Sequence, residues 1–516
     1  MSGKNNNYKG MEGLKMSNLT KMQFPEGYQC QYKETVMRLA NMIGRKKEGV
    51  QPGGEGSYQW DDPEYVCLEA GVTDEMAEVG LCLGSFQKKT AEQVAELRQN
   101  LDVIDYEAAA RYEKELRHDV MAHIHAWGDH CPMAHGIIHR GATSCLVDDN
   151  SDLIAYRDAM EQIRGLLLNV IEALADFIRA QKDTPVLAYT HYQAAQPTTL
   201  GKRACMWAQD FVFDLERLDF ELERLPFYGC KGATGTGASF LALFGGDAER
   251  AGALERRIAA DMGFDRVLPI TGQTYTRKID SFLLNVLSGI AQSAAKMATD
   301  LRLMAHEKEF DEPFTASQVG SSAMAYKRNP MRCERICSLA RPHVALAQAT
   351  AMTASSQWLE RTLDDSANRR ISIPEAFLTA DAVLSLAANV LRGARVYPGM
   401  MARHLAEELP FRATENILMR AVSLGGDRQE LHEAIREYSV DTARRMKETG
   451  CGNDLAERLL ADARFKLDEA ALAQLMDVGK FVGLAPVQAA DYVENTPAPL
   501  LEATRGRFAS GREISC

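Results

Sequence analysis

Long stretches of the chain repeat apolar residues at the three- and four-residue spacing of an α-helix. The clearest stretch follows residues 150–152 (NSD), whose side chains can cap a helix, and its apolar stripe continues without proline to Ile178. Similar stretches occupy roughly residues 198–225, 275–309, 330–358 and 374–393. Strand-like alternation of polar and apolar residues is scarce, so the pattern predicts an all-α fold.

The length of these stretches predicts a bundle that several subunits share. Stretches of about 25 to 35 residues form rods of roughly 40–50 Å, at about 1.5 Å per residue. Rods of that length with broad apolar faces cannot all be covered within one protomer. We therefore expect long helices that contribute to the helical core of an oligomer.

The helical pattern becomes shorter toward both ends of the chain. A pattern over residues 90–125 precedes the long stretches, and residues 46–57 (KKEGVQPGGEGS) offer almost nothing to bury, which predicts a loop or flexible segment. After about residue 397 the helices are short and are interrupted by Gly425-Gly426 and Pro486. We therefore expect three helical domains: an N-terminal domain over residues 1–143, with flexibility in residues 1–60, a central helix-bundle domain over 144–396, and a C-terminal domain over 397–516.

Composition narrows the class of protein. The chain has 516 residues, and no run of 18 apolar, uncharged residues or secretory signal is evident, so we expect a cytoplasmic protein that does not cross a membrane. A net charge of −12 argues against a general nucleic-acid binder. It leaves room for a small anionic substrate, because a few converging Arg and Lys residues set the local field. The eleven scattered Cys residues include no C-x-x-C pair, which favours reduced thiols.

Six of the eleven His residues crowd into 22 positions, which raises the question of a metal site. The chain contains no H-E-x-x-H motif, and His118 and His123 are five residues apart, which places them off a single helical face. We therefore expect no metal, and polar packing near a pocket for most of these residues. The six are His118, His123, His125, His130, His135 and His139.

Residues 320–330 (GSSAMAYKRNP) form a polar loop that leads into a predicted helix. Asn329 can cap that helix and Pro330 can occupy its first turn. Backbone N–H groups and the helix dipole at such a place favour negative charge, and Lys327 adds a positive charge. The loop suits a serine that must become an alkoxide, although on its own a Ser-Ser loop before a helix is more often only a loop and a cap.

The pattern G-S-S-x-M-x-x-K-x-N in this loop resembles the signature of the fumarase/aspartase superfamily. Further segments resemble its adenylosuccinate lyase family, and the animal-type enzymes more than the shorter bacterial ones. They are residues 141–152 (GATSCLVDDNSD), 190–199 (THYQAAQPTT), 231–236 (KGATGT), 271–278 (TGQTYTRK) and 360–370 (ERTLDDSANRR). The resemblance is close from about residue 101 to 436. It implies an all-α homotetramer whose active sites combine segments from three subunits.

The same resemblance implies a reaction that needs no cofactor. Fumarate would be eliminated from adenylosuccinate to give AMP, and from the succinylated aminoimidazole carboxamide ribotide SAICAR to give AICAR. Such an elimination requires a base for a carbon-bound proton, an acid for the departing nitrogen, and groups that stabilise the developing negative charge. The resemblance assigns Ser321 as the base and His191 as the acid. Lys327 and the loop amides would stabilise the serine anion.

The resemblance also assigns substrate contacts. Arg117, His118 and Asp119 would line the pocket. The succinyl carboxylates would be held by Thr143, Ser144, Ser322, Lys327 and Asn329, with Gln273 touching them or the base. The nucleotide would be held by Arg335, Arg361, Ser366 and Arg370, since arginine binds phosphate through a two-pronged fork.

The chain departs from the family pattern at a few positions. Ala194 and Ala325 stand where proline is usual, and Gly237 where glutamine is common. The Arg-Tyr pair of the animal-type N-terminal arm is absent before Arg111-Tyr112. Two other functions stay open on the sequence: a sibling lyase with another fumarate-releasing substrate, and a catalytically silent homologue that acts as a helical assembly protein. The segment 361–370 disfavours the first, and the intact predicted catalytic residues disfavour the second.

Overall fold

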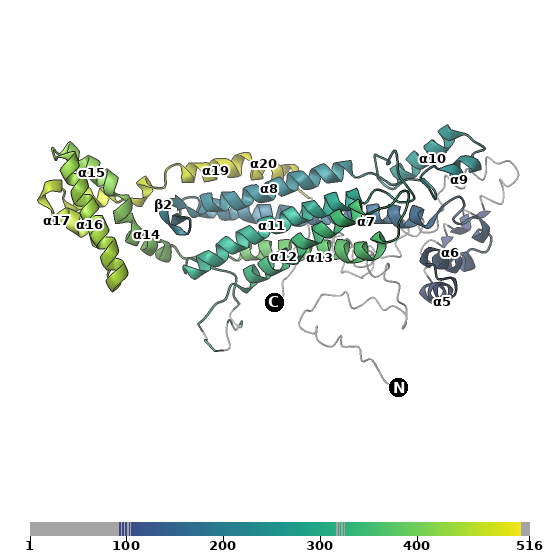
Figure 1. Ribbon diagram of the computed structural model, residues 1–516, viewed down its shortest axis with the longest axis horizontal. Helices are drawn as coiled ribbons and strands as arrows, with labels where there is room; N and C mark the ends of the chain where they lie inside the picture. Colours follow the sequence, from purple (N-terminus) through teal and green to yellow (C-terminus); the bar gives the residue numbers. More distant parts are fainter. Residues whose placement is uncertain are drawn as a thin grey trace.

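A bundle of long helices forms the middle of the molecule, and smaller groups of helices lie at its two ends (Figure 1). The computed structural model describes residues 92–93, 95–97, 99–100, 103, 105–315, 318, 320, 323–324 and 326–506. The loop predicted over residues 46–57 and most of the predicted N-terminal domain lie outside the described residues. The predominance of helix confirms the predicted all-α class.

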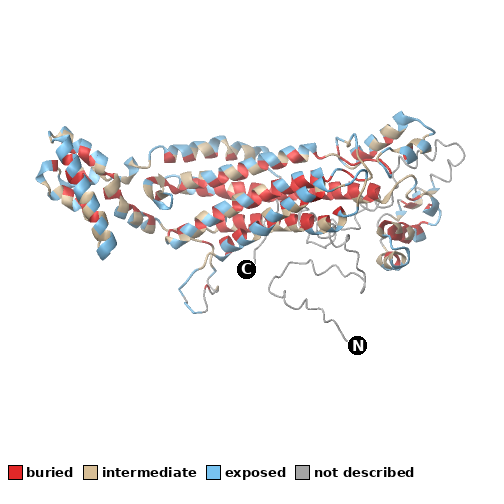
Figure 2. Cartoon of the chain, in the orientation of Figure 1, coloured by how far each residue is buried: buried red, intermediate tan, exposed pale blue. Residues whose placement is uncertain are grey.

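Five helices make up the bundle. They are α7 (Ser144–Gln181), α8 (Leu200–Arg224), α11 (Lys278–His306), α12 (Met331–Ser355) and α13 (Asp365–Arg392). In α7, 29 of the 38 residues are buried, which makes it the central helix (Figure 2). One part of α13 is long and apolar enough to span a membrane by composition alone, but 67% of it is buried inside the molecule, as expected of a core helix.

The prediction that residues 150–152 cap a helix was wrong. Helix α7 begins six residues earlier, after Thr143, and Asn150, Ser151 and Asp152 are buried within it. The Asn150 side chain donates to the carbonyls of Leu146 and Gly229. These polar residues interrupt an apolar stripe because they bind partners in the core, where an unpaired polar group would be costly.

At one end of the bundle lie α5 (Tyr106–Leu116), α6 (Asp119–His130), the turn η2 (His135–Ile137), α9 (Ala238–Leu243) and α10 (Ala248–Asp261) (Figure 1). The predicted helical pattern over residues 90–125 is broken at Arg117, which has a left-handed backbone with φ of 56°. Helix α6 packs on the first turns of α7, where Val120, Ile124 and Trp127 form a cluster with Val147.

The opposite end carries a hairpin and the C-terminal helices. Strands β1 (Pro185–Thr190) and β2 (Gln193–Thr199) pair antiparallel, directly after α7 and before α8. Beyond them lie α14 (Pro398–Arg412), α15 (Thr414–Ser423), α16 (Arg428–Thr449), α17 (Leu455–Ala461), η3 (Ala463–Phe465), α18 (Glu469–Leu475) and η4 (Val478–Lys480). A two-stranded antiparallel sheet of β3 (Phe310–Asp311) and β4 (Arg395–Val396) lies where this group meets the bundle.

The last two helices return along the bundle. Helices α19 (Ala485–Asn495) and α20 (Pro497–Ala503) pack on α7 and α8, and Ala489 and Val493 belong to the main core (Figure 1). Helices α15 to α18 instead enclose a separate small core around Ile417, Leu459 and Phe465. The region predicted as the C-terminal domain therefore has one part with its own core and one part that covers the bundle.

Candidate functional site

The predicted site residues within the described part of the chain fall into two groups at opposite ends of the bundle. The hairpin end holds His191, with Lys327, Asn329 and Arg335 around the start of α12. The other end holds Arg117, His118, Asp119, Thr143, Ser144, Gln273, Arg361, Ser366 and Arg370. Ser321 and Ser322 lie outside the described residues. Helix α7 separates the two groups by 38 residues, or roughly 57 Å.

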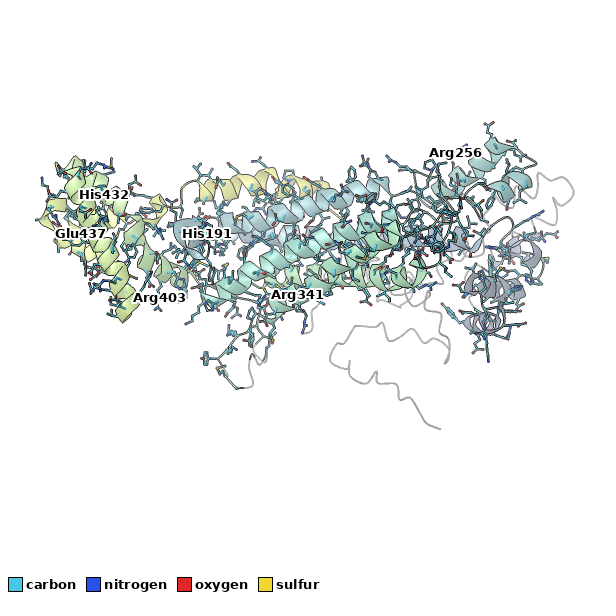
Figure 3. The ribbon with its side chains drawn as sticks, viewed as in Figure 1. His191, Arg256, Arg341, Arg403, His432 and Glu437 are labelled. Atoms are coloured by element: carbon cyan, nitrogen blue, oxygen red, sulfur yellow. The ribbon has the colours of Figure 1, made fainter. Side chains whose placement is uncertain are left out.

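His191 occupies the tip of the β1–β2 hairpin, beside the C-terminal helices (Figure 3). His191 and Tyr192 form its two-residue turn, and both have left-handed backbones, with φ of 53° and 56°. Two-residue hairpins favour such a turn, but side chains other than Gly, Asn and Asp rarely adopt it. The hairpin was missed in the sequence because no Asn-Gly or Asp-Gly pair marks it. His191 is exposed at this turn.

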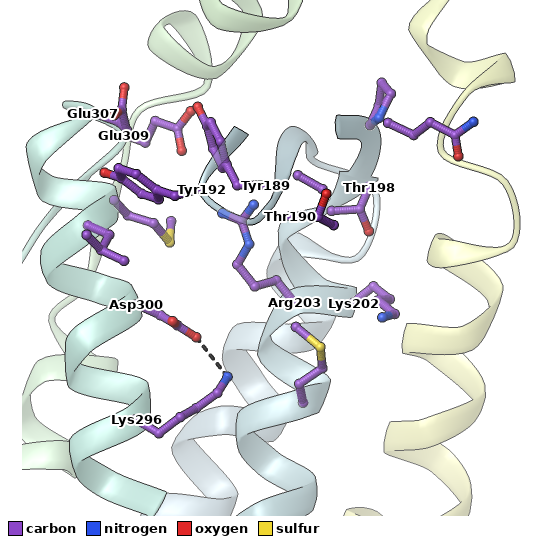
Figure 4. Close-up of a pocket in the computed structure, with 16 residues that line it drawn as sticks. Tyr189, Thr190, Tyr192, Thr198, Lys202, Arg203, Lys296, Asp300, Glu307 and Glu309 are labelled. Atoms are coloured by element: carbon purple, nitrogen blue, oxygen red, sulfur yellow. Dashed lines mark hydrogen bonds and ion pairs between the residues drawn. The ribbon is translucent and has the colours of Figure 1, made fainter. Parts of the chain in front are cut away.

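A pocket of about 530 Å³ lies beside this turn, between the hairpin, the start of α8 and the end of α11 (Figure 4). Thr190 and Tyr192, the two neighbours of His191 in sequence, line it. Burial raises the pKa of Tyr189 to about 12, so that phenol stays protonated. The Nζ of Lys296 lies 2.8 Å from Asp300 Oδ2, and this ion pair forms another part of the wall.

The loop before α12 differs from the prediction. Asn329 does not cap the helix, because its amide donates to the carbonyl of Gly320 at 2.9 Å and so closes the loop. Glu312 performs the capping instead, accepting from the backbone N–H of Arg332 and of Cys333 at 2.8 and 3.1 Å. The helix N–H groups predicted to stabilise a serine anion are thus bound to a carboxylate of the chain itself. Lys327 remains as an exposed cation on the loop.

At the other end, two helix N-termini carry predicted site residues. His118 precedes α6 and accepts from the N–H of Met121 through Nδ1 at 3.3 Å. Thr143 and Ser144 begin α7, and the Thr143 hydroxyl is buried with no hydrogen-bond partner among the described residues. Such a hydroxyl beside free backbone N–H groups can bind a carboxylate.

Gln273 and Arg361 lie on two segments that are hydrogen-bonded to each other. The N–H of Gln273 donates to the carbonyl of Glu360 at 2.9 Å, and the hydroxyl of Tyr228 donates to the carbonyl of Gln273 at 2.7 Å. A Cβ added to Gly272 would lie 2.4 Å from the Glu360 oxygen, so only glycine allows this approach.

A buried network of ion pairs ties the same segments to α7. Arg277 binds Asp149 of α7 and Asp365 of α13, with closest distances of 3.1 and 2.6 Å. Arg369 of α13 binds Asp152 of α7 and Asp280 of α11, both at 2.7 Å. In the sequence the only sign of this network is two carboxylates, Asp149 and Asp152, directly before the long apolar stripe.

The histidines near α6 pack against aromatic and buried neighbours. Across the parts of the chain that the structure describes, no three His, Cys, Asp or Glu side chains converge as metal ligands would. The ring of His125 contacts those of Tyr112 and His135, with centroids 5.3 and 5.5 Å apart, and His123 is buried within α6. These contacts are polar packing beside the predicted pocket.

The chain is similar to lyases in both sequence and fold. A family model described as "Lyase" matches residues 68–342. The crystal structure of a fumarate lyase from Mesorhizobium sp. BNC1 covers 90% of this chain and 96% of its own, with a TM-score of 0.66 and 22% sequence identity. The long-helix bundle and the sequence segments placed on it define a helical lyase of the fumarase/aspartase superfamily.

The relatives narrow the class to one family. A model described as "Adenylosuccinate lyase C-terminus" matches residues 410–492. The adenylosuccinate lyase of Saccharomyces cerevisiae is 52% identical over 407 residues, which make up 78% of this chain and 84% of the yeast protein. That of Schistosoma mansoni is 43% identical over 83% of this chain and 89% of its own. The chain belongs to the adenylosuccinate lyase family.

Proposed function

We propose that this chain eliminates fumarate from adenylosuccinate to give AMP, and from SAICAR to give AICAR, in purine nucleotide biosynthesis. One observation carries the proposal: the chain is 52% identical to a yeast adenylosuccinate lyase over 407 residues, which make up 78% of its length. The rival superfamily lyases are disfavoured by the match of residues 410–492 to the C-terminal region of this family.

The chemistry follows from two groups on opposite sides of the substrate. The anion of Ser321 takes a proton from the succinyl carbon next to the carbon that bears nitrogen. The electron pair of that C–H bond becomes the double bond of fumarate, and the carbon–nitrogen bond breaks. The imidazolium of His191 gives its proton to the departing nitrogen. Because Glu312 occupies the N–H groups of Arg332 and Cys333 at the start of α12, the serine anion depends on Lys327 and the loop amides.

We further propose a homotetramer with shared active sites. His191 and the group around His118, Gln273 and Arg361 are separated by the length of α7 within one chain. Antiparallel packing of two bundles brings the hairpin end of one copy to the α6 end of another. Apolar side chains on the bundle support such packing, because they stay exposed in the single chain: Phe213, Phe220, Phe282, Met352 and Ile371. The free cysteines fit the cytoplasm as its location.

The test is fumarate release from purified protein supplied with adenylosuccinate, and with SAICAR in parallel. Ser321→Ala and His191→Ala should each lower kcat by a factor of at least about 100 at unchanged thermal stability. Ser439→Ala, which alters a serine of α16 far from the loop, is the matched control and should keep wild-type kcat. Turnover that survives both catalytic substitutions would overturn the assigned roles. No turnover by the wild type would favour the silent assembly protein.

A further inference from the structure

Asp365 occupies a particular place in the buried ion network, because its two carboxylate oxygens bind different arginines. Oδ2 accepts from Nε of Arg277 at 2.6 Å, and Oδ1 accepts from Nη1 of Arg361 at 2.9 Å. Only 1% of the Asp365 side chain and 2% of the Arg277 side chain are exposed. Arg361 is 24% exposed, so it lies where the network reaches the surface.

The contacts of Arg361 fix its orientation. Nη1 donates to Asp365 and also to the carbonyl of Thr362 at 2.7 Å. Within the described residues, Nε and Nη2 take part in no hydrogen bond. A guanidinium held by one nitrogen is preorganised to present its remaining donors to an anion, because its planar fork then loses little freedom on binding.

Asp365 is itself held in place by the buried Arg277. Arg277 binds it with Nε while Nη1 and Nη2 bind both oxygens of Asp149, at 3.3 and 3.1 Å. Burial alone would raise the pKa of Asp365, but the attraction of Arg277 and Arg361 outweighs burial, so the pKa lies below its usual range. The carboxylate therefore stays charged at neutral pH and keeps its two partners.

We propose that Asp365 is a positioning residue that acts through Arg361: it holds this arginine in the orientation that binds the phosphate of the substrate nucleotide. The proposal rests on the proposed function, which supplies the phosphate. It predicts that the substrate contact of Arg361 depends on a residue that does not touch the substrate. Arg361 meets the phosphate equally in the ground state and the transition state, so its misplacement raises KM more than it changes kcat.

A double-mutant cycle on the full tetrameric enzyme tests this. Asp365→Asn keeps the size of the side chain and removes its charge, and we expect a roughly tenfold rise in KM for adenylosuccinate with kcat within about twofold. Arg361→Ala should raise KM at least as much. The double variant should match Arg361→Ala alone, because a residue that acts through Arg361 has no effect once Arg361 is gone.

Asp280→Asn is the matched control from the same network. Asp280 is equally buried and binds Arg369 and Tyr275, at 2.7 and 2.6 Å, but it does not contact Arg361. It should lower the melting temperature while leaving KM within about twofold of wild type. If Asp365→Asn does not fold, Asp365→Glu replaces it in the double-mutant cycle. Glutamate keeps the negative charge opposite Arg277, and its extra methylene displaces Arg361.

The inference is overturned if Asp365→Asn leaves KM unchanged, if its effect on KM is as large in the Arg361→Ala background as in the wild type, or if Asp280→Asn raises KM equally. Failure of the proposed function is distinguishable, since it would remove fumarate release from the wild type. In that case, the affinity for AMP of the wild type, the two single variants and the double variant would be measured by titration calorimetry. A wild type that neither turns over adenylosuccinate nor binds AMP overturns the inference together with the function.

Discussion

The separation of the predicted site residues along α7 makes a quantitative prediction about mixed oligomers. His118→Asn and His191→Asn remove one imidazole from each end of the bundle. Asparagine is chosen at both positions for a structural reason: it can cap α6 in place of His118, and it tolerates the left-handed backbone of His191. Each variant alone should lose at least about 100-fold in kcat/KM while its melting temperature stays close to wild type.

Mixing the two variants should restore activity. Since α7 places its two ends roughly 57 Å apart, the proposed complete site takes the hairpin from one subunit and α6 from another. When equal amounts assemble at random, half of the hairpins carry an intact His191 and half of the α6 segments an intact His118. About a quarter of the sites are then intact, so the mixture should reach about a quarter of wild-type activity. If both residues came from one chain, every site would carry a defect and nothing would be restored.

The assay is fumarate release after the two variants are unfolded together in denaturant and refolded. An affinity tag on one variant, which must retain the untagged partner on the resin, shows that mixed oligomers have formed. Activity that stays at the average of the two parents, although both chains are present in the same oligomers, would refute the separation of the site residues between subunits. A mixture of each variant with itself, treated in the same way, controls for recovery after refolding.

Three further predictions concern stability. Gly272→Ala should destabilise the fold by about 2–3 kcal/mol, because the new Cβ would lie 2.4 Å from the Glu360 oxygen; an unchanged melting temperature would mean that the two segments can move apart. Asp214→Asn should stabilise the protein by about 1–2 kcal/mol near pH 7.5 and have little effect near pH 4. Burial raises the pKa of Asp214 from 3.8 to about 6, so the folded state is disfavoured once this carboxyl ionises. Urea unfolding at both pH values measures the gain in free energy of unfolding, and an equal gain at pH 4 and pH 7.5 would contradict this explanation. His343→Leu should reduce the loss of stability between about pH 6.5 and pH 4. Burial lowers the pKa of His343 to about 4, so between these pH values the unfolded chain binds a proton that the folded chain does not. If the free energy of unfolding fell equally with pH in the variant and the wild type, His343 would not be the cause.

Much of the fold could be predicted from the sequence, because the long helices bury wide apolar faces. The stretches predicted over residues 198–225, 275–309 and 330–358 correspond to α8, α11 and α12 within a few residues. Helices α7 and α13 begin earlier than predicted: the early turns of α7 contain the buried carboxylates Asp149 and Asp152, and those of α13 contain the buried Asp365 and Arg369. Periodicity counts such residues as polar, so it cannot distinguish a charge that pairs in the core from one that ends a helix.

The tertiary structure decided how the chemical groups are arranged. The segment 271–278 and the segment 360–370 resemble family motifs in sequence, but their attachment to each other depends on a backbone contact at Gly272 and on ion pairs between residues 88 or more positions apart. No local pattern contains that information, because each arginine finds its carboxylate only after the helices have packed. The capping of α12 by Glu312 likewise depends on a contact between residues 20 positions apart. The hairpin that supports His191 is local, but its turn carries no sequence signature of a hairpin. The sequence by itself determined the helical class, the family and the identity of the candidate residues, since these follow from local periodicity and motif. Which of those residues share an end of the molecule, and which lie too far apart to meet within one chain, was decided by the 38-residue length and direction of α7 in the packed bundle.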